Sequence, residues 1–575
     1  MTRLTIQNFR NLDGVDIPFA GSPVIVGENR VGKSNLVHAI RLVLDSSLSN
    51  AARRLRTEDF SDHLGPDPIA DGAEIRISVE IEDFGDDGRL MAALRHAIVS
   101  GDPLRARITY RFGPGELAED EEEHELSADA YGWTIYGRDD DDPRRIPVEL
   151  RTRLHHEYLG ALRDAQGDLR SWRRSPLREL LEQAARDADP EELERLRAAL
   201  KEANAAVGDL GSVRDLGERV GRETARLVGD LHALDPTLQV GATDPERAVR
   251  DLRLMLDGEA QRSLSAASLG SLNVLYLALL ELDLARRVAG GEIQHTLISI
   301  EEPEVHLHPH LQRRVFRKLQ QGDGPTRSTL VTTHSPHIVS VTDPKQLVML
   351  RATGATSTAF AALEADLNDR EWDDIARYLD VTRSELVFAR KVLLVEGLSE
   401  HLLLLPIAAH EGIDLDGEGI TICAIGGVNF KPYVRFLRAL GTRCAVITDG
   451  DPRGPLSRTG ANRVRVLAKA VSGDDVDPEE IGFFHGEHTL ELDLYDADDD
   501  NAAALLDALD QFKWGNEREE ELQDALAGAG LAPDRLMTFI DAVQKGRFAQ
   551  RVAGENEMLV PPDYVRRALA YLREE

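Results

Sequence analysis

The chain has 575 residues, with 68 Lys and Arg residues against 101 Asp and Glu residues, so its formal net charge is −33. At roughly 100–200 residues per domain this length suggests several domains, and a hydrophobic content of 42 % allows sizeable cores. Two cysteines exclude a disulfide framework. The charge excludes a nucleic-acid binder that uses its whole surface. Any contact with DNA or RNA requires a local basic patch or bound metal ions.

The sequence also indicates where the protein works. Its longest apolar run, Leu402 to Ala409, is far shorter than the about 20 residues that a membrane-spanning helix needs. The N-terminus lacks the basic and apolar pattern of a signal peptide and begins like a β-strand. We therefore expect a cytoplasmic protein without a membrane contact.

In chain order, the pattern of apolar residues predicts an α/β protein with a helical insert. Residues 2–9 alternate like a strand, and the apolar run 23–26 is followed by a glycine-rich turn and a helical pattern. Residues 74–84 and 104–112 alternate as antiparallel strands do. Residues 176–231 are predicted to be helical, with apolar stripes that could pack within one subunit or against a second one.

A phosphate-binding motif follows the second predicted strand. Residues 27–34, Gly-Glu-Asn-Arg-Val-Gly-Lys-Ser, fit the pattern G-x-x-x-x-G-K-[ST]. Its glycines let backbone N–H groups surround phosphates at a helix N-terminus, its lysine neutralises the β- and γ-phosphates, and its serine hydroxyl binds Mg²⁺. The sequence therefore predicts a site for ATP with Mg²⁺, formed by Gly27, Asn29, Gly32, Lys33, Ser34 and Asn35.

Two later strands end in residues that complete such a site. The apolar strand 296–300 leads into Glu301 and Glu302, of which the first is expected to hold Mg²⁺ and the second to orient the attacking water. The strand 328–331 leads to His334, at the strand end where doubly wound sheets bind ligands. We expect His334 to lie at the nucleotide.

Together with residues 268–273, which open a long apolar helix, these motifs resemble the ATP-binding-cassette (ABC) ATPases of the SMC, Rad50 and RecF branch. The resemblance implies that Ser268 and Gly270 of one head complete the nucleotide site of another, hence at least a dimer. Two features depart from the pattern: Glu301 stands where an aspartate is usual, and the loop lacks its second glycine. Fast ATP turnover is therefore not implied.

The second half contains an ordered set of acidic strand ends. A strand at 391–395 leads into Glu396, with Glu400 in the helix that follows, and a strand at 443–448 leads into Asp449 and Asp451. Alternate residues of an extended segment face the same way, so Asp449 and Asp451 are expected to share one cation. Adjacent parallel strands would bring Glu396 beside them. Carboxylate oxygens of this kind suit Mg²⁺ or Mn²⁺.

This set, with Gly426-Gly427 between its members, resembles the Toprim fold of topoisomerases, primases and nucleases. An ABC head followed by a Toprim domain resembles the OLD (overcoming lysogenization defect) nucleases, which include the Gabija antiphage nuclease. The resemblance implies an N-terminal ATPase lobe, a helical dimerisation insert, a C-terminal ATPase lobe, a linker and a Toprim nuclease domain, at residues 1–170, 171–245, 246–362, 363–388 and 389–575.

The resemblance also assigns roles to residues that are otherwise unremarkable. Within residues 489–494 it implies that Glu491 helps to bind metal, and in residues 545–549 that Lys545 is catalytic. A lysine there could neutralise charge on the reacting phosphate. The implied ligands of two Mg²⁺ or Mn²⁺ ions are Glu396, Glu400, Asp449, Asp451 and Glu491, and the expected catalytic residues are Glu396, Asp449, Asp451, Lys545 and, for ATP, Glu302.

The expected function is a nucleotide-regulated, metal-dependent DNA endonuclease of antiphage defence, acting as a homo-oligomer. A helicase partner is suggested only by some family members. Two alternatives stay open: an ATP-driven DNA clamp or repair mediator without cleavage, and an RNA nuclease activated on infection. A topoisomerase is disfavoured because no segment supplies a nucleophilic tyrosine and a strand-passage gate. The sequence does not distinguish DNA from RNA, activation from inhibition by ATP, or a dimer from a tetramer.

Overall fold

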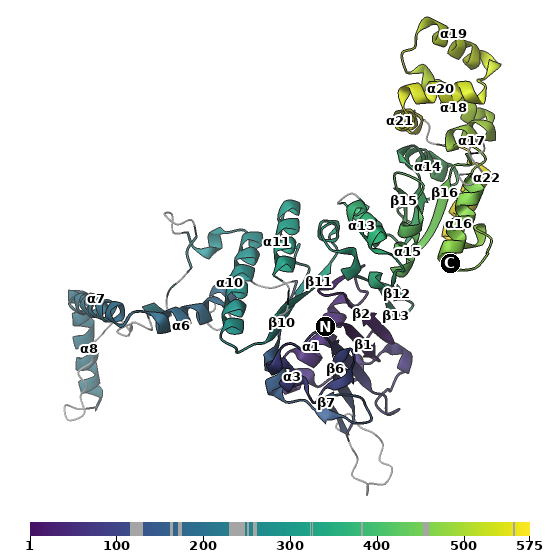
Figure 1. Ribbon diagram of the computed structural model, residues 1–575. Helices are drawn as coiled ribbons and strands as arrows, with labels where there is room; N and C mark the ends of the chain where they lie inside the picture. Colours follow the sequence, from purple (N-terminus) through teal and green to yellow (C-terminus); the bar gives the residue numbers. More distant parts are fainter. Residues whose placement is uncertain are drawn as a thin grey trace. The chain divides into compact units, whose positions relative to one another are not determined.

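The computed structural model describes most of the chain, in two compact units (Figure 1). The first unit comprises Met1–Leu159, Leu297–Glu304 and Pro309–Glu575, and the second Gly160–Thr296 and Val305–His308. Within the described ranges no helix is long and apolar enough to cross a membrane. The described residues are 1–115, 130–161, 165–170, 175–228, 248–249, 252, 254–256, 262–322, 324, 326–380, 383–451, 459–555 and 558–574.

A seven-stranded antiparallel sheet forms part of the first unit, in the order β2-β1-β4-β6-β7-β8 with β5 paired to β6. The alternation at residues 74–84 and 104–112 correctly predicts an antiparallel pair. Three alternate side chains of β4, those of Ile75, Ile77 and Val79, are buried because one face of the sheet packs on the core. The strands are Arg3–Gln7, Val15–Pro18, Ile75–Ile81, Ile98–Gly101, Leu104–Pro114, Tyr131–Gly137 and Arg144–Arg145, from β1, β2 and β4 to β8.

A second, six-stranded sheet positions the nucleotide motifs, in the order β13-β12-β3-β11-β10-β9. Strand β3 runs parallel to both β11 and β12. The loops after β3 and β11 therefore leave the sheet at the same edge, and helix α1 (Lys33–Leu44) starts there. The strands are Val24–Gly27, Leu154–Leu159, His295–Glu301, Arg327–Thr333, Leu347–Thr353 and Thr356–Ala361, for β3 and β9 to β13.

The third sheet, also in the first unit, carries the second acidic set. Its strands β14 (Lys391–Val395), β15 (Ile420–Ala424), β16 (Arg443–Thr448) and β17 (Phe483–His485) are all parallel, in the order β15-β14-β16-β17. Leu393 and Val395 face one core, and Val392 and Leu394 face another. A strand buried on both faces has a continuous apolar sequence, as here.

Helices cover both faces of this sheet. The core that contains Leu393 includes side chains of α14, α17, α18, α20, α21 and α22, whereas the core that contains Leu394 includes side chains of α15 and α16. The helices, with α19, span Leu398–His410, Lys431–Ala439, Gly460–Ser472, Leu490–Ala497, Asp499–Asp510, Asn516–Asp524, Pro533–Val543, Lys545–Glu555 and Asp563–Arg573, from α14 to α22.

The segment predicted as a linker contains a packed helix, α13 (Asp369–Tyr378). Asn368 caps its N-terminus, and Trp372, Ile375 and Tyr378 are buried. The helix contacts α15. The helix is amphipathic, with its charged residues on the outer face. Because charged residues outnumber the buried ones, the composition of the segment suggested a linker. The remaining short helices of this unit that bear on the core are α3 (Gly88–Leu94), α4 (Val148–Arg153), α11 (Pro309–Gln321) and α12 (Pro336–Val339).

The second unit is helical. It contains α5 (Ala165–Arg170), α6 (Leu177–Asp187), α7 (Pro190–Gly208), α8 (Gly211–Val228) and α10 (Leu269–Ala289). Helix α10 contacts α5 and α6, and α7 contacts α8. The predicted helicity of residues 176–231 is seen up to Val228, and the rest lies outside the described residues.

Candidate nucleotide and nuclease sites

Lys33 is the first residue of α1 and is mostly buried. Its Nζ donates hydrogen bonds to the backbone carbonyl oxygens of Gly27 (3.0 Å) and Glu28 (2.8 Å). Burial lowers the pKa of Lys33 to about 8, against the opposing effect of Glu302 and two neighbouring glutamates. The protein thus holds a partly desolvated ammonium group inside the loop, where a phosphate would restore its charge balance.

Two glycines of this loop have conformations that other residues rarely adopt. Gly32 has φ +94°, and a Cβ there would lie 2.6 Å from the Asn11 side chain. Gly27 has φ +154°, and a Cβ there would lie 2.6 Å from the carbonyl oxygen of Leu350. The left-handed backbone and the close approach both require glycine.

Ser34 and Glu301 are 267 positions apart in the sequence, yet the Ser34 hydroxyl donates a 2.8 Å hydrogen bond to Glu301 Oε2. The Tyr158 hydroxyl donates to the other oxygen of Glu301 at 3.1 Å. His334 Nε2 lies 3.4 Å from Glu302 Oε1. The structure therefore brings these predicted residues together at one sheet edge. A hydroxyl beside a carboxylate is a donor pair that suits nucleotide-bound Mg²⁺.

Glu304, which the sequence analysis did not single out, holds this edge in place. Its Oε1 accepts hydrogen bonds from the Thr333 hydroxyl (2.7 Å) and from the His334 backbone N–H (2.8 Å). Burial raises the pKa of Glu304. The sequence does show Glu304 two residues after the predicted pair Glu301 and Glu302. It does not show which of these carboxylates is buried against the strand ends.

The other predicted nucleotide residues differ in setting. Asn29 is exposed. The Asn35 amide already has protein partners, because it accepts a hydrogen bond from Arg10 (2.8 Å) and donates one to Asn11 (2.7 Å). Ser268 and Gly270 belong to the second compact unit. There Ser268 caps α10, and a Cβ on Gly270 would lie 2.3 Å from the carbonyl oxygen of His306.

In the third sheet, Glu396 follows β14 and lies beside the end of β16, as the parallel pairing predicts. Its Oε1 accepts hydrogen bonds from the Asp449 backbone N–H (2.9 Å) and from the Thr448 hydroxyl. The strand ends therefore hold this carboxylate in a fixed position.

Asp449 and Asp451 differ in burial and in partners, and the expectation that they share one cation stays a prediction. Asp451 lies beyond the end of β16 and has φ +47°, a left-handed conformation, and the alternation rule holds only for extended backbone. Asp449 is buried and accepts a 3.2 Å hydrogen bond from the Leu490 N–H. The half-exposed Asp451 instead pairs with Arg463 at 2.7 Å.

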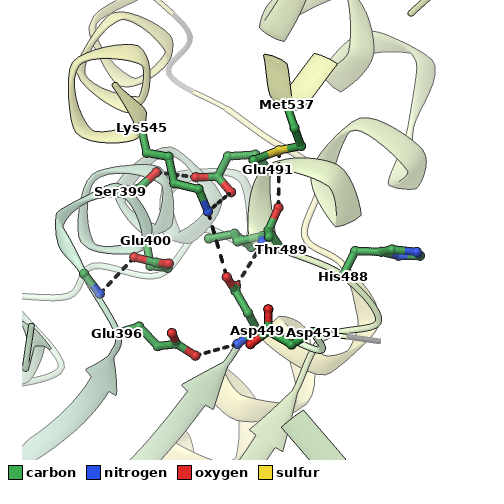
Figure 2. A network of polar contacts seen from close by, with 12 residues as sticks. Glu396, Ser399, Glu400, Asp449, Asp451, His488, Thr489, Glu491, Met537 and Lys545 are labelled. Carbon is green, nitrogen blue, oxygen red and sulfur yellow. Dashed lines mark hydrogen bonds and ion pairs between the residues drawn. The ribbon is translucent and has the colours of Figure 1, made fainter. Parts of the chain in front are cut away.

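Glu400, Glu491 and Lys545 converge beside Asp449 (Figure 2). Glu491 is fully buried in the first turn of α17 and accepts a 2.7 Å hydrogen bond from Ser399. Lys545 Nζ lies 3.3 Å from Glu491 Oε2 and 4.0 Å from Asp449 Oδ2. Residues from four separate segments of the domain thus meet in one polar network.

The electrostatics of this network favour an added cation. Burial, followed by the neighbouring charges of Glu396 and Glu491, raises the pKa of Asp449 to about 8. Burial also raises the pKa of Glu400. Burial lowers the pKa of Lys545, but the carboxylates of Glu491 and Asp449 outweigh it, and the net shift is upward. A divalent cation would relieve the repulsion among these acids.

In the described part of the chain, no three carboxylate, histidine or cysteine groups are arranged as ready ligands of one metal ion. Two basic side chains, Lys545 and Arg463, stand among the acids instead. The donor set of Glu396, Glu400, Asp449, Asp451 and Glu491 still fits Mg²⁺ or Mn²⁺ in charge and ligand type. Arg463 was missed by the sequence analysis because it has no motif around it.

The sheets and sites define a class of protein: an ABC-type ATPase head joined to a Toprim nuclease domain. A family model for the Toprim domain of overcoming-lysogenization-defect-like proteins matches residues 387–451. A second model, an AAA domain whose description names the AbiEii toxin of a type IV toxin–antitoxin system, matches residues 24–340. The chain belongs to the OLD family and is an endonuclease with an ATP-binding domain.

Its relatives are similar over most of their length. The OLD nuclease of Thermus scotoductus is 25 % identical over 468 residues, which cover 78 % of this chain and 82 % of the relative. The endonuclease GajA of Bacillus cereus is 22 % identical over 487 residues, covering 82 % and 78 %. The solved C-terminal region of the Burkholderia pseudomallei OLD protein is 30 % identical, with a TM-score of 0.27, and covers 32 % of this chain and 98 % of that one.

Proposed function

We propose that this protein is a nucleotide-regulated, metal-dependent DNA endonuclease. The observation that carries the proposal is the convergence of Lys545 with the buried carboxylates of Asp449 and Glu491. A clamp without cleavage has no use for a lysine among buried acids. A reaction that develops negative charge on a phosphate does, because a positioned cation stabilises that charge.

Five carboxylates would hold the metal ions: Glu396, Glu400, Asp449, Asp451 and Glu491. When bound, two divalent cations activate water and stabilise the leaving oxygen of a phosphodiester. The chain's own residues then have distinct tasks. Glu396, fixed by Thr448 and by the Asp449 backbone, keeps one carboxylate at the strand ends. Lys545 stays protonated and faces the reacting phosphate.

The ATPase head is proposed to act as the regulator. Lys33 and Ser34 would bind the phosphates and Mg²⁺ of ATP, Glu301 would hold the same Mg²⁺, and Glu302 would orient the attacking water. The geometry of Ser34 beside Glu301 and of Glu302 beside His334 supports these roles. ATP binding would alter the head and so change access to the nuclease site.

Further parts of the proposal rest on resemblance to relatives. Action on DNA is proposed because the Toprim resemblance implies cleavage of a phosphodiester. Assembly into a homo-oligomer is proposed because the resemblance to ABC ATPases implies that Ser268 and Gly270 of one head complete the nucleotide site of another. A role in antiphage defence is proposed from the resemblance to the Gabija nuclease, and a helicase partner from its presence in some family members. The proposed domains span residues 1–170, 171–245, 246–362, 363–388 and 389–575.

The test is cleavage of supercoiled plasmid with Mg²⁺ or Mn²⁺, with and without ATP. We expect nicked or linear product with metal, none with EDTA, and none from an Asp449→Ala, Asp451→Ala variant. Lys33→Ala should cleave without responding to ATP. Cleavage that persists in the double variant would show that the Toprim acids are not the active site. Cleavage of a single-stranded RNA alone would favour the RNA nuclease.

A further inference from the structure

Arg463, in the first turn of α16, joins two acidic groups of the nuclease site. Its Nη1 donates a 2.7 Å hydrogen bond to Asp451 Oδ2, and its Nη2 lies 3.2 Å from Glu396 Oε1. The same Nη2 also donates to the backbone carbonyl oxygen of Asp449. One guanidinium thus connects the end of β14 with the end of β16.

This arrangement differs from an ordinary surface ion pair. The Arg463 side chain is 14 % exposed and that of Glu396 is 19 % exposed, so solvent screens the charges weakly. Arginine remains protonated at every pH that proteins tolerate, and its planar donors match two carboxylates at once. Arg463 therefore places a permanent positive charge between Glu396 and Asp451.

A guanidinium between Glu396 and Asp451 opposes the binding of a metal ion to the same two carboxylates. Glu396 and Asp451 are two of the proposed metal ligands, and one oxygen of each accepts a hydrogen bond from Arg463. A divalent cation on both carboxylates would also repel the guanidinium, which cannot lose its proton. Metal and arginine therefore compete for the same two side chains.

The surroundings of Arg463 leave room for it to move. A cavity of about 260 Å³ is lined by the polar residues Arg463 and Asn462 on α16 and Asn429 and Lys431 after β15, and otherwise mostly by apolar residues. Lys431 pairs with Glu371 at 2.9 Å at this edge. A guanidinium that swings to the mouth of this cavity, beside the amide groups of Asn462 and Asn429, suits a phosphate of the substrate backbone, which it binds through two parallel hydrogen bonds.

We propose that Arg463 is the resident cation of the nuclease site: a divalent metal ion displaces its guanidinium from Glu396 and Asp451, and the released group binds a phosphate of the nucleic-acid substrate. The inference rests on the proposed function and deepens it. Metal binding then adds positive charge to the site and makes Arg463 available to bind a substrate phosphate. Arg463 is a positioning residue for metal and a contact for substrate.

Metal binding tests the first half without any cleavage. Mn²⁺ is titrated into the full-length protein, free of nucleic acid, by calorimetry. Arg463→Ala removes the competing cation and should tighten Mn²⁺ binding by about fivefold. This factor corresponds to the free energy of a favourable, partly exposed ion pair. Arg463→Lys keeps a positive charge and should stay near the wild type. Lys469→Ala, at an exposed position of the same helix, is the matched control and should change nothing.

Substrate binding tests the second half. A fluorescent DNA duplex is titrated at several salt concentrations with Ca²⁺ as the metal. Arg463→Ala should weaken DNA binding about threefold. It should also reduce the slope of log affinity against log salt concentration by about one, as the loss of one phosphate contact does. Lys469→Ala should leave both the affinity and its salt dependence unchanged.

Each outcome decides the matter. Unchanged or weaker Mn²⁺ binding in a folded Arg463→Ala variant overturns the displacement, and unchanged DNA binding overturns the phosphate contact. If the wild type and the Asp449→Ala, Asp451→Ala variant bind Mn²⁺ alike, the metal-dependent nuclease itself is wrong. If only the double variant loses Mn²⁺ while Arg463→Ala shows no gain, the nuclease stands and the role of Arg463 falls.

Discussion

Glu28, the second residue of the phosphate-binding loop, forms a two-pronged ion pair with Arg390, with both nitrogen–oxygen distances at 2.6 Å. The hydrogen bonds from Arg390 hold the pKa of Glu28 below its usual range. Arg390 directly precedes β14, and β14 directly precedes Glu396. One salt bridge and one strand thus connect the nucleotide loop with the nuclease acids.

Breaking the Glu28–Arg390 ion pair should reduce the effect of ATP on DNA cleavage. Both side chains are more than half exposed, so Arg390→Ala should cost at most about 1 kcal/mol of stability. We expect it to bind ATP and to cleave DNA with metal, but to respond less to ATP. Plasmid cleavage across an ATP titration measures this. The swapped double variant Glu28→Arg, Arg390→Glu should regain the response, and an undiminished response in the single variant would exclude this connection.

Lys545 should matter for the chemical step rather than for metal binding. Replacing it by methionine removes the cation that faces Asp449 and Glu491 while keeping the length of the side chain. Single-turnover cleavage should fall by about 10²–10³-fold, as for other lost electrostatic contacts to a transition state. Mn²⁺ affinity, measured by calorimetry, should stay equal or rise. A Lys545→Met variant that cleaves like the wild type would remove the lysine from the mechanism.

Metal binding should depend on pH through Asp449. Because the pKa of this carboxyl is raised to about 8, a metal ion must expel its proton below that pH. Mn²⁺ affinity should rise by up to about tenfold per pH unit between pH 6 and 8, then level off. The sign for stability is opposite: the raised pKa stabilises the metal-free fold at low pH, and this is lost as pH rises through about 8. Asp449→Asn should flatten the thermal stability profile.

Nucleotide binding should show the opposite dependence through Lys33. Burial lowers the pKa of its ammonium group to about 8, and ATP phosphates favour the charged form. ATP binding should therefore take up a proton above pH 8, and the affinity should fall by up to about tenfold per unit beyond it. Fluorescent-nucleotide titrations from pH 7 to 9.5 measure the slope. Lys33→Arg, which does not titrate in this range, should bind with a flat profile.

Gly450, between Asp449 and Asp451, should tolerate no side chain. A Cβ there would lie 2.3 Å from the carbonyl oxygen of Glu487, in the loop that leads to Glu491. Gly450→Ala should destabilise the protein by about 1–3 kcal/mol, the usual cost of overpacking, and should reduce cleavage. Chemical denaturation measures the loss. Gly88→Ala, where nothing lies within 4 Å of the new Cβ, is the control and should be neutral.

The sequence by itself determined the features that are local in the chain. The phosphate-binding loop, the strands of the third sheet and the acids that follow them are visible because strand, turn and helix need particular residues at fixed spacing. Parallel pairing then placed Glu396 beside Asp449 correctly. Lys545 and Glu491 were found only through the resemblance to the OLD family, since nothing in their own spacing marks them.

Only the tertiary structure decided which side chains meet. The left-handed backbone of Asp451, which removes the basis of the alternation rule, cannot be predicted from residue spacing. Arg463 reaches Glu396 across 67 positions of sequence, and Glu28 reaches Arg390 across 362. Such contacts depend on how helices and strands pack, and packing is a property of the whole core rather than of any segment.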